Sequence, residues 1–430
     1  MTVHNPRTLT DAETFLIEAY SAADWLAGDD KVRASRDTAI EALKTNGLPT
    51  RRVEAFHYTD LRANLAKGYS PSQRPNSDLA AHAMLDYERL IPAVRLPMVN
   101  GYYFADMADD LPEGVSVIPG FQSGDFGSSV VALANTVETL NTAFTNDGVS
   151  ISFAADSTVA GNIGIANSYV GEEGGMAVTR NKVSVGKNAK GKIVDRFCGN
   201  NGVAYLSSSV VNITIEEGAT LNYTLVIEEG DMAQRLARLS VELKDNATLN
   251  LFVLNGGGKL VRQEIYFEVK GENVALNISG VNLIGGDALI DVTSVINHHT
   301  PNTVSNEIFR NVVTGRGKGV FQGQINVAQA AQLTDARMAC NTLLLSDDCD
   351  FSAKPELEIF ADDVQCAHGA TVTDLEESYL FYLMARGISK EAARRMLIKA
   401  FVAEVVEEMD DEALVEALES RIDVWMEKHV

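Results

Sequence analysis

Glu217-Gly218-Ala219-Thr220-Leu221-Asn222 begins a pattern that returns as Asp245-Asn246-Ala247-Thr248-Leu249-Asn250 and Glu272-Asn273-Val274-Ala275-Leu276-Asn277. A related turn, Lys187-Asn188-Ala189, precedes the three. The aligned positions 189, 219, 247 and 274 are 30, 28 and 27 residues apart. A loose period of this length, repeating strand, turn and strand, is typical of a β-solenoid, whose rungs bury their inward side chains in one continuous core.

The segments between these turns read as strands. Apolar and polar residues alternate with a period of two in Val211–Ile215, Leu239–Leu243 and Ile265–Val269, as expected for half-buried strands. Regular short strands also occur in β-sandwiches, which leaves that fold as the alternative. The recurring turn-Ala-x-Leu-Asn pattern favours the solenoid.

Helical segments flank this β region. Thr10-Asp-Ala-Glu13 predicts a capping box, and a second helix should end at Gly47. After the β region, Thr373-Asp-Leu-Glu376 predicts another capping box, and a further helix should open near Ser389. We therefore expect a mostly helical N-terminal domain over 1–145, a β-helix core over 146–370 and a C-terminal helical domain over 371–430, with residues 66–145 assigned only loosely.

Composition and charge narrow the class of protein. The net charge is -23, from 59 acidic and 36 basic residues, which disfavours a nucleic-acid partner. The segment 1–7 lacks the apolar run of a signal peptide, and nowhere do 18 apolar residues follow one another, so we expect no membrane span. The four cysteines are widely spaced, as expected of free thiols in a reducing compartment. The chain therefore reads as cytoplasmic.

Two soft metal ligands stand out in Cys366-Ala-His368-Gly-Ala-Thr371. On an extended backbone, residues i and i+2 project from one face with Cα atoms roughly 6.6 Å apart. Two ligands are too few for zinc or iron, so Cys366 and His368 would form half a site that another chain completes. The alternative is an inert buried cysteine beside a hydrogen-bonded histidine. His298 and His299 are adjacent, so on a strand they face opposite ways and a structural role is expected.

Several catalytic motifs are absent from the sequence. It contains no G-x-x-x-x-G-K-[ST] loop, no G-x-S-x-G elbow and no H-E-x-x-H motif. We therefore expect no nucleotide site in this chain and no ATP hydrolysis by it. A β-helix enzyme acting on polysaccharide is a weaker reading, because such enzymes usually carry a secretory signal.

The region 297–388 resembles the SufB/SufD family of iron–sulfur cluster assembly proteins, and its Cys-x-His-Gly-Ala-Thr form is similar to the SufD branch. The segments that carry the resemblance are His298-His299, Thr303-Val-Ser-Asn-Glu307-Ile-Phe-Arg310, Gly315-Arg-Gly-Lys-Gly-Val-Phe-Gln-Gly323, Thr334-Asp-Ala-Arg337, Leu343-Leu-Leu-Ser-Asp-Asp348, Lys354-Pro-Glu-Leu-Glu-Ile-Phe-Ala-Asp-Asp363, Cys366-Ala-His-Gly-Ala-Thr371 and Arg386-Gly-Ile388. Shorter matches lie upstream at Gly47–Arg51, Tyr58–Leu61 and Asn141–Phe144.

This resemblance implies a mainly β fold: a right-handed parallel β-helix core flanked by N-terminal and C-terminal α-helical domains. It also implies a non-catalytic scaffold subunit that pairs with a SufB-like paralogue through the β-helix. A SufC-like ATPase would dock on the C-terminal helices, whose apolar stripe includes Ile388, Leu397 and Phe401.

His368 would then be a candidate ligand for a nascent iron–sulfur cluster or iron at the SufB interface, with Cys366 nearby. A reduced flavin is associated with such complexes, although the sequence shows no flavin site. Two alternatives remain open, a purely structural scaffold subunit without cluster ligands and a homodimeric scaffold.

Overall fold

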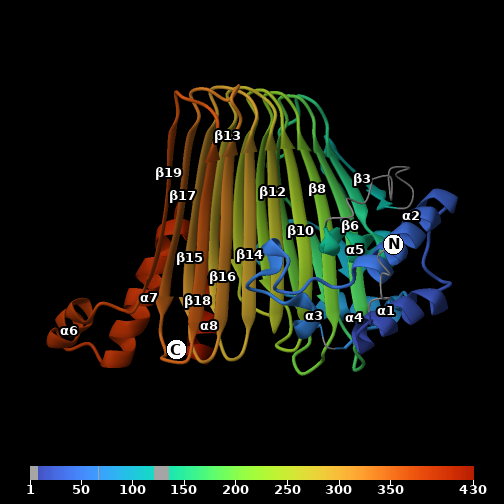
Figure 1. Cartoon of the computed structure of the whole chain (residues 1–430), viewed down its shortest axis with the longest axis horizontal. Helices are drawn as coiled ribbons and strands as arrows, with labels where there is room; N and C mark the ends of the chain where they lie inside the picture. Colours follow the sequence, from blue (N-terminus) through green and yellow to red (C-terminus); the bar gives the residue numbers. More distant parts are fainter. Residues whose placement is uncertain (1–7, 66, 121–134) are drawn as a thin grey trace, which may run out of the picture.

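The computed structural model describes residues 8–65, 67–120 and 135–430 of the chain. The segment 1–7, which we used to argue against a signal peptide, lies outside the described residues. Two long sheets stack their strands along one axis, and helices lie at the flanks (Figure 1). The fold is therefore a β-solenoid, as the repeat predicts, and the sandwich alternative is wrong.

The odd-numbered strands other than β3, with β2 at one end, form the first sheet, which we call the odd sheet. Its members are β1 (Ala93–Val99), β2 (Tyr102–Tyr103), β5 (Asn162–Tyr169), β7 (Lys190–Gly199), β9 (Thr220–Glu228), β11 (Thr248–Asn255), β13 (Ala275–Ile284), β15 (Val304–Val313), β17 (Asp335–Leu344) and β19 (Gln365–Thr373).

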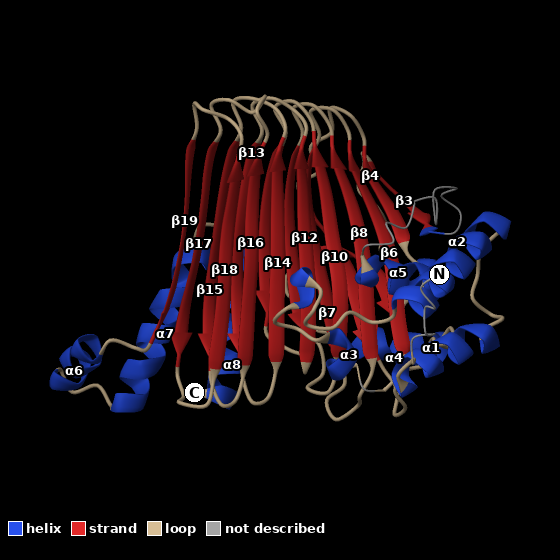
Figure 2. Cartoon of the chain, in the orientation of Figure 1, coloured by secondary structure: helices blue, strands red, loops and turns tan. Residues whose placement is uncertain are grey.

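The second sheet, here the even sheet, contains β3 and the even-numbered strands from β4 onward. Its members are β3 (Val115–Pro119), β4 (Val149–Phe153), β6 (Met176–Val185), β8 (Leu206–Ile215), β10 (Gln234–Leu243), β12 (Leu260–Val269), β14 (Leu289–His298), β16 (Lys318–Val327) and β18 (Asp350–Ile359). The chain thus adds one strand to each sheet per turn, and Figure 2 shows the resulting stack.

Neighbouring strands within each sheet are parallel, except for the antiparallel pairs β1–β2 and β3–β4 at the N-terminal end. Thr220 pairs with Thr248, and Thr248 pairs with Ala275, which confirms the predicted alignment of the repeats. The residue before each aligned alanine or valine adopts a left-handed conformation, as at Gly218 (φ 70°) and Asn246 (φ 56°). Glycine and asparagine tolerate this conformation better than other residues, which explains their recurrence at the turns.

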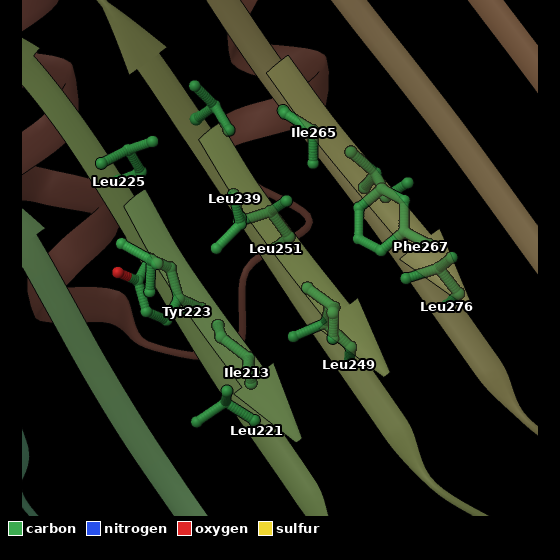
Figure 3. Close-up of a cluster of buried hydrophobic side chains, with 14 of the residues drawn as sticks. Ile213, Leu221, Tyr223, Leu225, Leu239, Leu249, Leu251, Ile265, Phe267 and Leu276 are labelled. Carbon is green, nitrogen blue, oxygen red and sulfur yellow. The ribbon is translucent and has the colours of Figure 1, made fainter. Parts of the chain in front are cut away.

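Inward side chains fill the space between the two sheets, which we call the lumen. Leu249, Leu251 and Phe267 are at most 2% exposed there and contact residues of adjacent rungs (Figure 3). Burial of each such side chain contributes roughly 1.5–3 kcal/mol. The core therefore runs continuously along the axis of the solenoid.

Helices cover the outer faces of the sheets. Helix α5 packs on the even sheet together with α1 and α2, whereas α7 and α8 pack on the odd sheet. The helices are α1 (Asp11–Ala22), α2 (Asp30–Asn46), α3 (Leu61–Asn64), α4 (Ser77–Asp86), α5 (Thr136–Phe144), α6 (Glu377–Ala385), α7 (Lys390–Val406) and α8 (Glu412–His429), with 3-10 turns η1 (Glu54–Phe56) and η2 (Ala105–Met107).

The helix ends agree with the sequence at three of the four predicted positions. Thr10 and Glu13 form the predicted capping box, Gly47 ends α2, and Ser389 caps α7. The capping box at Thr373 is wrong: Thr373 is the last residue of β19, and α6 begins at Glu377 without a side-chain cap. The loosely assigned region contributes β1, which pairs with β5, so the stack of strands begins before residue 146.

A segment around η1 lies across the outer face of the even sheet (Figure 1). Hydrogen bonds to a buried ion pair of that sheet hold it there. Arg262 Nη1 donates to Asp291 Oδ2 at 2.6 Å, and Arg262 Nη2 donates to the carbonyl oxygen of Ala55 at 2.9 Å. The hydroxyl of Thr59 donates to the same carboxylate, and the ring of Phe56 lies 4.8 Å from the guanidinium. This arrangement ties residues 55–59 to the middle of the solenoid.

Candidate functional site

The C-terminal end of the solenoid is open. Strands β18 and β19 are the last strands of their sheets, and most of their side chains are exposed or half-buried. Inward positions here include Leu357, which is half-buried, and Ile359, which is 39% exposed. We call this uncovered last rung the mouth. It presents both apolar side chains and the unpaired backbone groups of two edge strands.

Cys366 and His368 both belong to β19, so the extended backbone predicted for them is confirmed. Cys366 pairs with Ala336, and His368 pairs with Met338, whose side chains are buried in the lumen. Residues 366 and 368 therefore occupy inward positions of the mouth, on one face of the strand. Cys366 packs partly against the core, and this burial raises the pKa of its thiol. His368 is exposed.

The mouth holds two candidate ligands of this chain. Within residues 8–65, 67–120 and 135–430, no group of three or more His, Cys, Asp and Glu side chains is arranged to hold a metal ion. An iron or cluster at the mouth therefore needs ligands from another molecule. The ligand roles of Cys366 and His368 stay a prediction.

His298 and His299 face different environments, as their adjacency on a strand predicts. His298 is 1% exposed, and its Nδ1 and Nε2 lie 2.8 Å from Thr303 Oγ1 and 3.0 Å from Ser305 Oγ. Burial lowers the pKa of His298 to about 4. His299 lies outside, with its Nε2 2.6 Å from Glu268 Oε2. The pair is therefore no single metal site.

Sequence reasoning missed a polar cluster inside the lumen, below the mouth. Glu307 on β15 is fully buried among apolar neighbours, and Ser294 lies on β14 in the even sheet. Burial raises the pKa of Glu307 to about 7, an effect that the Ser294 hydroxyl partly offsets. The alternation of Ser305, Glu307 and Phe309 was the available signal, because a period of two puts Glu307 on the same face as Phe309.

The C-terminal helices differ in how much of their surface packs against the solenoid. Helix α7 buries Ile398 and Val402 against the odd sheet, and Phe401 packs there beneath Arg310, whose guanidinium is 5.4 Å from the ring. The predicted docking residues Ile388 and Leu397 are half-buried. Helix α6 lies beyond the mouth and buries none of its residues (Figure 1). Its large exposed side chains are Tyr379, Phe381, Tyr382 and Met384, which we call the α6 surface.

Comparison with known protein families shows which family this chain matches. The model of the SufBD core domain of the SUF system for FeS cluster assembly matches residues 168–401, and the model of the SufBD N-terminal region matches residues 26–165. The chain belongs to the SufBD family. The matched core begins within β5 and runs through the mouth to α7, so it includes the lumen, Cys366 and His368.

Individual members of the SufBD family show which branch this chain is similar to. It is 28% identical to the iron–sulfur cluster assembly protein SufD of Escherichia coli over 394 residues, 89% of this chain and 90% of that protein. The chloroplastic protein ABCI7 of Arabidopsis thaliana is 27% identical over 86% of this chain and 81% of its own length. SufB of Bacillus subtilis is 28% identical over 49% of this chain and 45% of its length. The likeness to SufD spans nearly the whole chain, whereas the likeness to this SufB spans half.

Among the described residues, none of the helices has both the length and the apolar character needed to cross a bilayer.

Proposed function

We propose that this protein is a SufD-type subunit of an iron–sulfur cluster assembly complex that pairs with a SufB-like paralogue at the mouth. The observation that carries the proposal is the uncovered last rung, in which His368 and Cys366 occupy inward positions of an edge strand. Such edges are normally covered or paired. A second strand stack would cover the apolar side chains and add the ligands that the mouth lacks.

His368 is the better candidate for direct ligation. Its side chain is exposed at the mouth, whereas Cys366 is partly withdrawn into the core and its raised pKa disfavours the thiolate that binds metal. In this proposal His368 holds nascent cluster or iron at the seam between the subunits. Cys366 becomes a ligand once a nearby metal ion lowers the pKa of its thiol.

We expect His368→Ala to abolish most cluster formation on the purified complex without loss of the SufB-like partner. The imidazole is exposed and makes no contribution to the buried core, so its removal should leave folding intact. Cluster content after anaerobic reconstitution, read from iron, sulfide and the visible spectrum, is the measurement. His299→Ala is the matched control, because that exposed histidine lies away from the mouth on the outer surface.

An unchanged cluster yield in His368→Ala, and in the double variant with Cys366→Ala, would show that this subunit is a structural scaffold. If the chain alone forms a stable dimer through the mouth that a SufB-like partner does not displace, the homodimeric scaffold replaces the SufB pairing.

We further propose that a SufC-like ATPase docks on the α6 surface. Aromatic side chains that are 54–73% exposed, as Tyr379, Phe381 and Tyr382 are, are enriched in interface cores. The helix projects beyond the solenoid, so a partner can reach it without disturbing the core (Figure 1). ATP-dependent movement of this partner would pull on α7, which packs on β13 and β15, and so shift the mouth.

Replacing Tyr379, Phe381 and Tyr382 together by serine is expected to stop co-purification of the ATPase while the SufB-like partner still binds. Unfolding temperature should change little, because none of the three is buried. Serine at Leu79 and Leu85, two exposed residues of α4, is the control. Full retention of the ATPase by the triple variant would exclude the α6 surface as the contact.

A further inference from the structure

A groove lies between the C-terminal end of α8 and the turns that lead from the odd sheet to the even sheet, and we call it the α8 groove. Its volume is about 510 Å³, within the range of about 300–1,000 Å³ that small-molecule sites have. Two glycine-rich turns line it: Gly256–Gly258 follows β11, and Gly285–Gly286 follows β13. These turns lie away from the strands of the mouth, so a ligand here does not depend on the pairing proposed above.

Apolar side chains line the α8 groove from both the turns and the helix. Met232, in the turn between β9 and β10, is 38% exposed, and Val424 on α8 is 52% exposed. Leu254 and Leu283, near the ends of β11 and β13, also line the groove and are at most 2% exposed. The groove thus offers a ligand an apolar surface that the fold leaves partly uncovered.

The carboxylates that line the α8 groove are mostly compensated by arginines of this chain. Three of the four form ion pairs: Glu228 with Arg196 and Arg421, Glu229 with Arg235, and Asp287 with Arg316. The fourth, Asp231, accepts a hydrogen bond from the N–H of Gly202 at 2.7 Å and has no cationic partner among the described residues. The acidic side chains therefore leave little free negative charge in the groove.

Two lysines of the α8 groove have no such compensation. Lys259, in the turn after β11, and Lys428, in the last turn of α8, are exposed. Neither forms an ion pair with any residue that the structure describes. Hydrogen bonds from Arg316 hold the pKa of Asp287 low, and the ammonium group of Lys259 adds a smaller part. In a chain with a net charge of -23, two lysines left without carboxylates in one groove favour an anion from outside.

Backbone donors are also available in the α8 groove. The N–H groups of Gly285, Gly286 and Asp287 have no hydrogen-bond partner within residues 8–65, 67–120 and 135–430. Gly286 has a left-handed conformation, with φ 61°. Successive N–H groups around a left-handed residue can form a concave site for an anion. The turn after β13 can therefore donate to an anionic head group that the lysines attract.

We propose that the α8 groove binds a small phosphate ester with an apolar body. The phosphate is held by Lys259, Lys428 and the N–H groups of the turn after β13, and the apolar body lies against Met232 and Val424. A phosphate ester has three acceptor oxygens and a charge of about -1.5 to -2 at pH 7, which suits two ammonium groups and several N–H donors better than a carboxylate does. Lysine binds phosphate as a point charge. The apolar walls favour an ester over inorganic phosphate, because only the ester buries apolar surface.

Fluorescence titration of the purified full-length chain with naphthyl phosphate tests the site, and we expect saturable binding by the wild type. Lys259→Ala combined with Lys428→Ala should weaken binding about tenfold, since charge-assisted hydrogen bonds are lost. Val424→Asp should weaken it as well, because the new carboxylate repels the phosphate. Asp231→Asn removes a like charge, while its amide oxygen can still accept from Gly202, and should strengthen binding by up to about fivefold.

Lys190→Ala combined with Lys318→Ala is the matched control, since it removes two exposed lysines that lie outside the groove. Naphthol lacks the phosphate and inorganic phosphate lacks the apolar body, so both should bind more weakly than naphthyl phosphate. Vesicles that contain phosphatidic acid distinguish the source of the ester. Retention of the wild type but not of the double-lysine variant would identify a lipid head group, and binding of naphthyl phosphate without retention on vesicles would identify a soluble ester.

The proposal is overturned if the wild type shows no saturable binding, or if the double-lysine variant binds as tightly as the wild type. An equal loss in the control variant would also overturn it, because the effect would then come from net charge alone. Equal binding of naphthol would show that the anionic head is not recognised, and equal binding of inorganic phosphate would show that the apolar walls have no role; either result excludes the proposed ligand.

Thermal unfolding shows whether each variant is folded. Folding should be retained, because Asp231, Lys259, Val424 and Lys428 are all exposed. Should Val424→Asp unfold, the lysine variants and Asp231→Asn still decide the question.

Discussion

Arg262→Ala is expected to lower the free energy of unfolding by about 3–5 kcal/mol, because it leaves a buried carboxylate without its counter-charge. Arg262 and Asp291 are both 0% exposed and lie 2.6 Å apart. The same substitution removes the hydrogen bond to Ala55 that holds the η1 segment on the even sheet. Urea denaturation followed by far-ultraviolet circular dichroism is the measurement.

Arg316→Ala is the control for the Arg262 variant. Arg316 pairs with Asp287 at 2.7 Å and 2.8 Å, but both side chains are more than 60% exposed, so its loss should cost at most about 1 kcal/mol. If Arg262→Ala cost no more than Arg316→Ala, water would have to reach the interior pair. Limited proteolysis near residue 55 should also speed up in Arg262→Ala and remain unchanged in Arg316→Ala.

Acid is expected to destabilise the protein through His298, by up to about 3 kcal/mol between pH 7 and pH 4. In the unfolded chain an ordinary histidine takes up a proton near pH 6.5. In the folded chain, burial lowers the pKa of His298 to about 4. The unfolded state therefore binds more protons in this window, and stability falls as the pH falls. Above about pH 6.5 the effect vanishes.

His298→Gln isolates this contribution, since an amide can still bond Thr303 and Ser305 but does not titrate. The difference in unfolding free energy between wild type and variant should change by up to about 3 kcal/mol over the window, whereas other acids and bases cancel. His82→Gln, on the exposed surface of α4, is the control for the exchange of a histidine for glutamine outside the core. A wild-type slope identical to that of His298→Gln would mean that the ring has the same pKa in the folded and unfolded chains, which would contradict the expected effect of burial.

Most of what the sequence predicts about the fold comes from the repeated turn pattern. The turns before Ala219, Ala247 and Val274 recur because Gly218, Asn246 and Asn273 adopt the same left-handed conformation, so the repeat in the sequence reflects a repeat in the backbone geometry. The pairing of β1 with β5 could not be predicted from the sequence. Ala93 pairs with Asn162, about 70 residues further on, and no local sequence pattern indicates so distant a partner. The η1 segment escaped notice for the same reason, since Thr59 bonds Asp291 across more than 200 residues.

The candidate site was partly predictable. The spacing of Cys366 and His368 needs only an extended backbone to place them on one face, and the structure provides it. Glu307 was not recognised, because its environment is created by strands of the other sheet, among them β14 with Ser294. The false capping box at Thr373 had a similar cause: pairing of β19 with β17 keeps that residue extended.

The two ends of the strand stack differ in strand orientation, which bears on how the proposed pairing would close. At the N-terminal end, β2 and β3 run antiparallel to their neighbours and interrupt the parallel register. At the other end the register stops with nothing reversed. If the pairing proposed above uses the mouth of each solenoid, association closes after two solenoids have met, and a filament of stacked copies would need the N-terminal end as well.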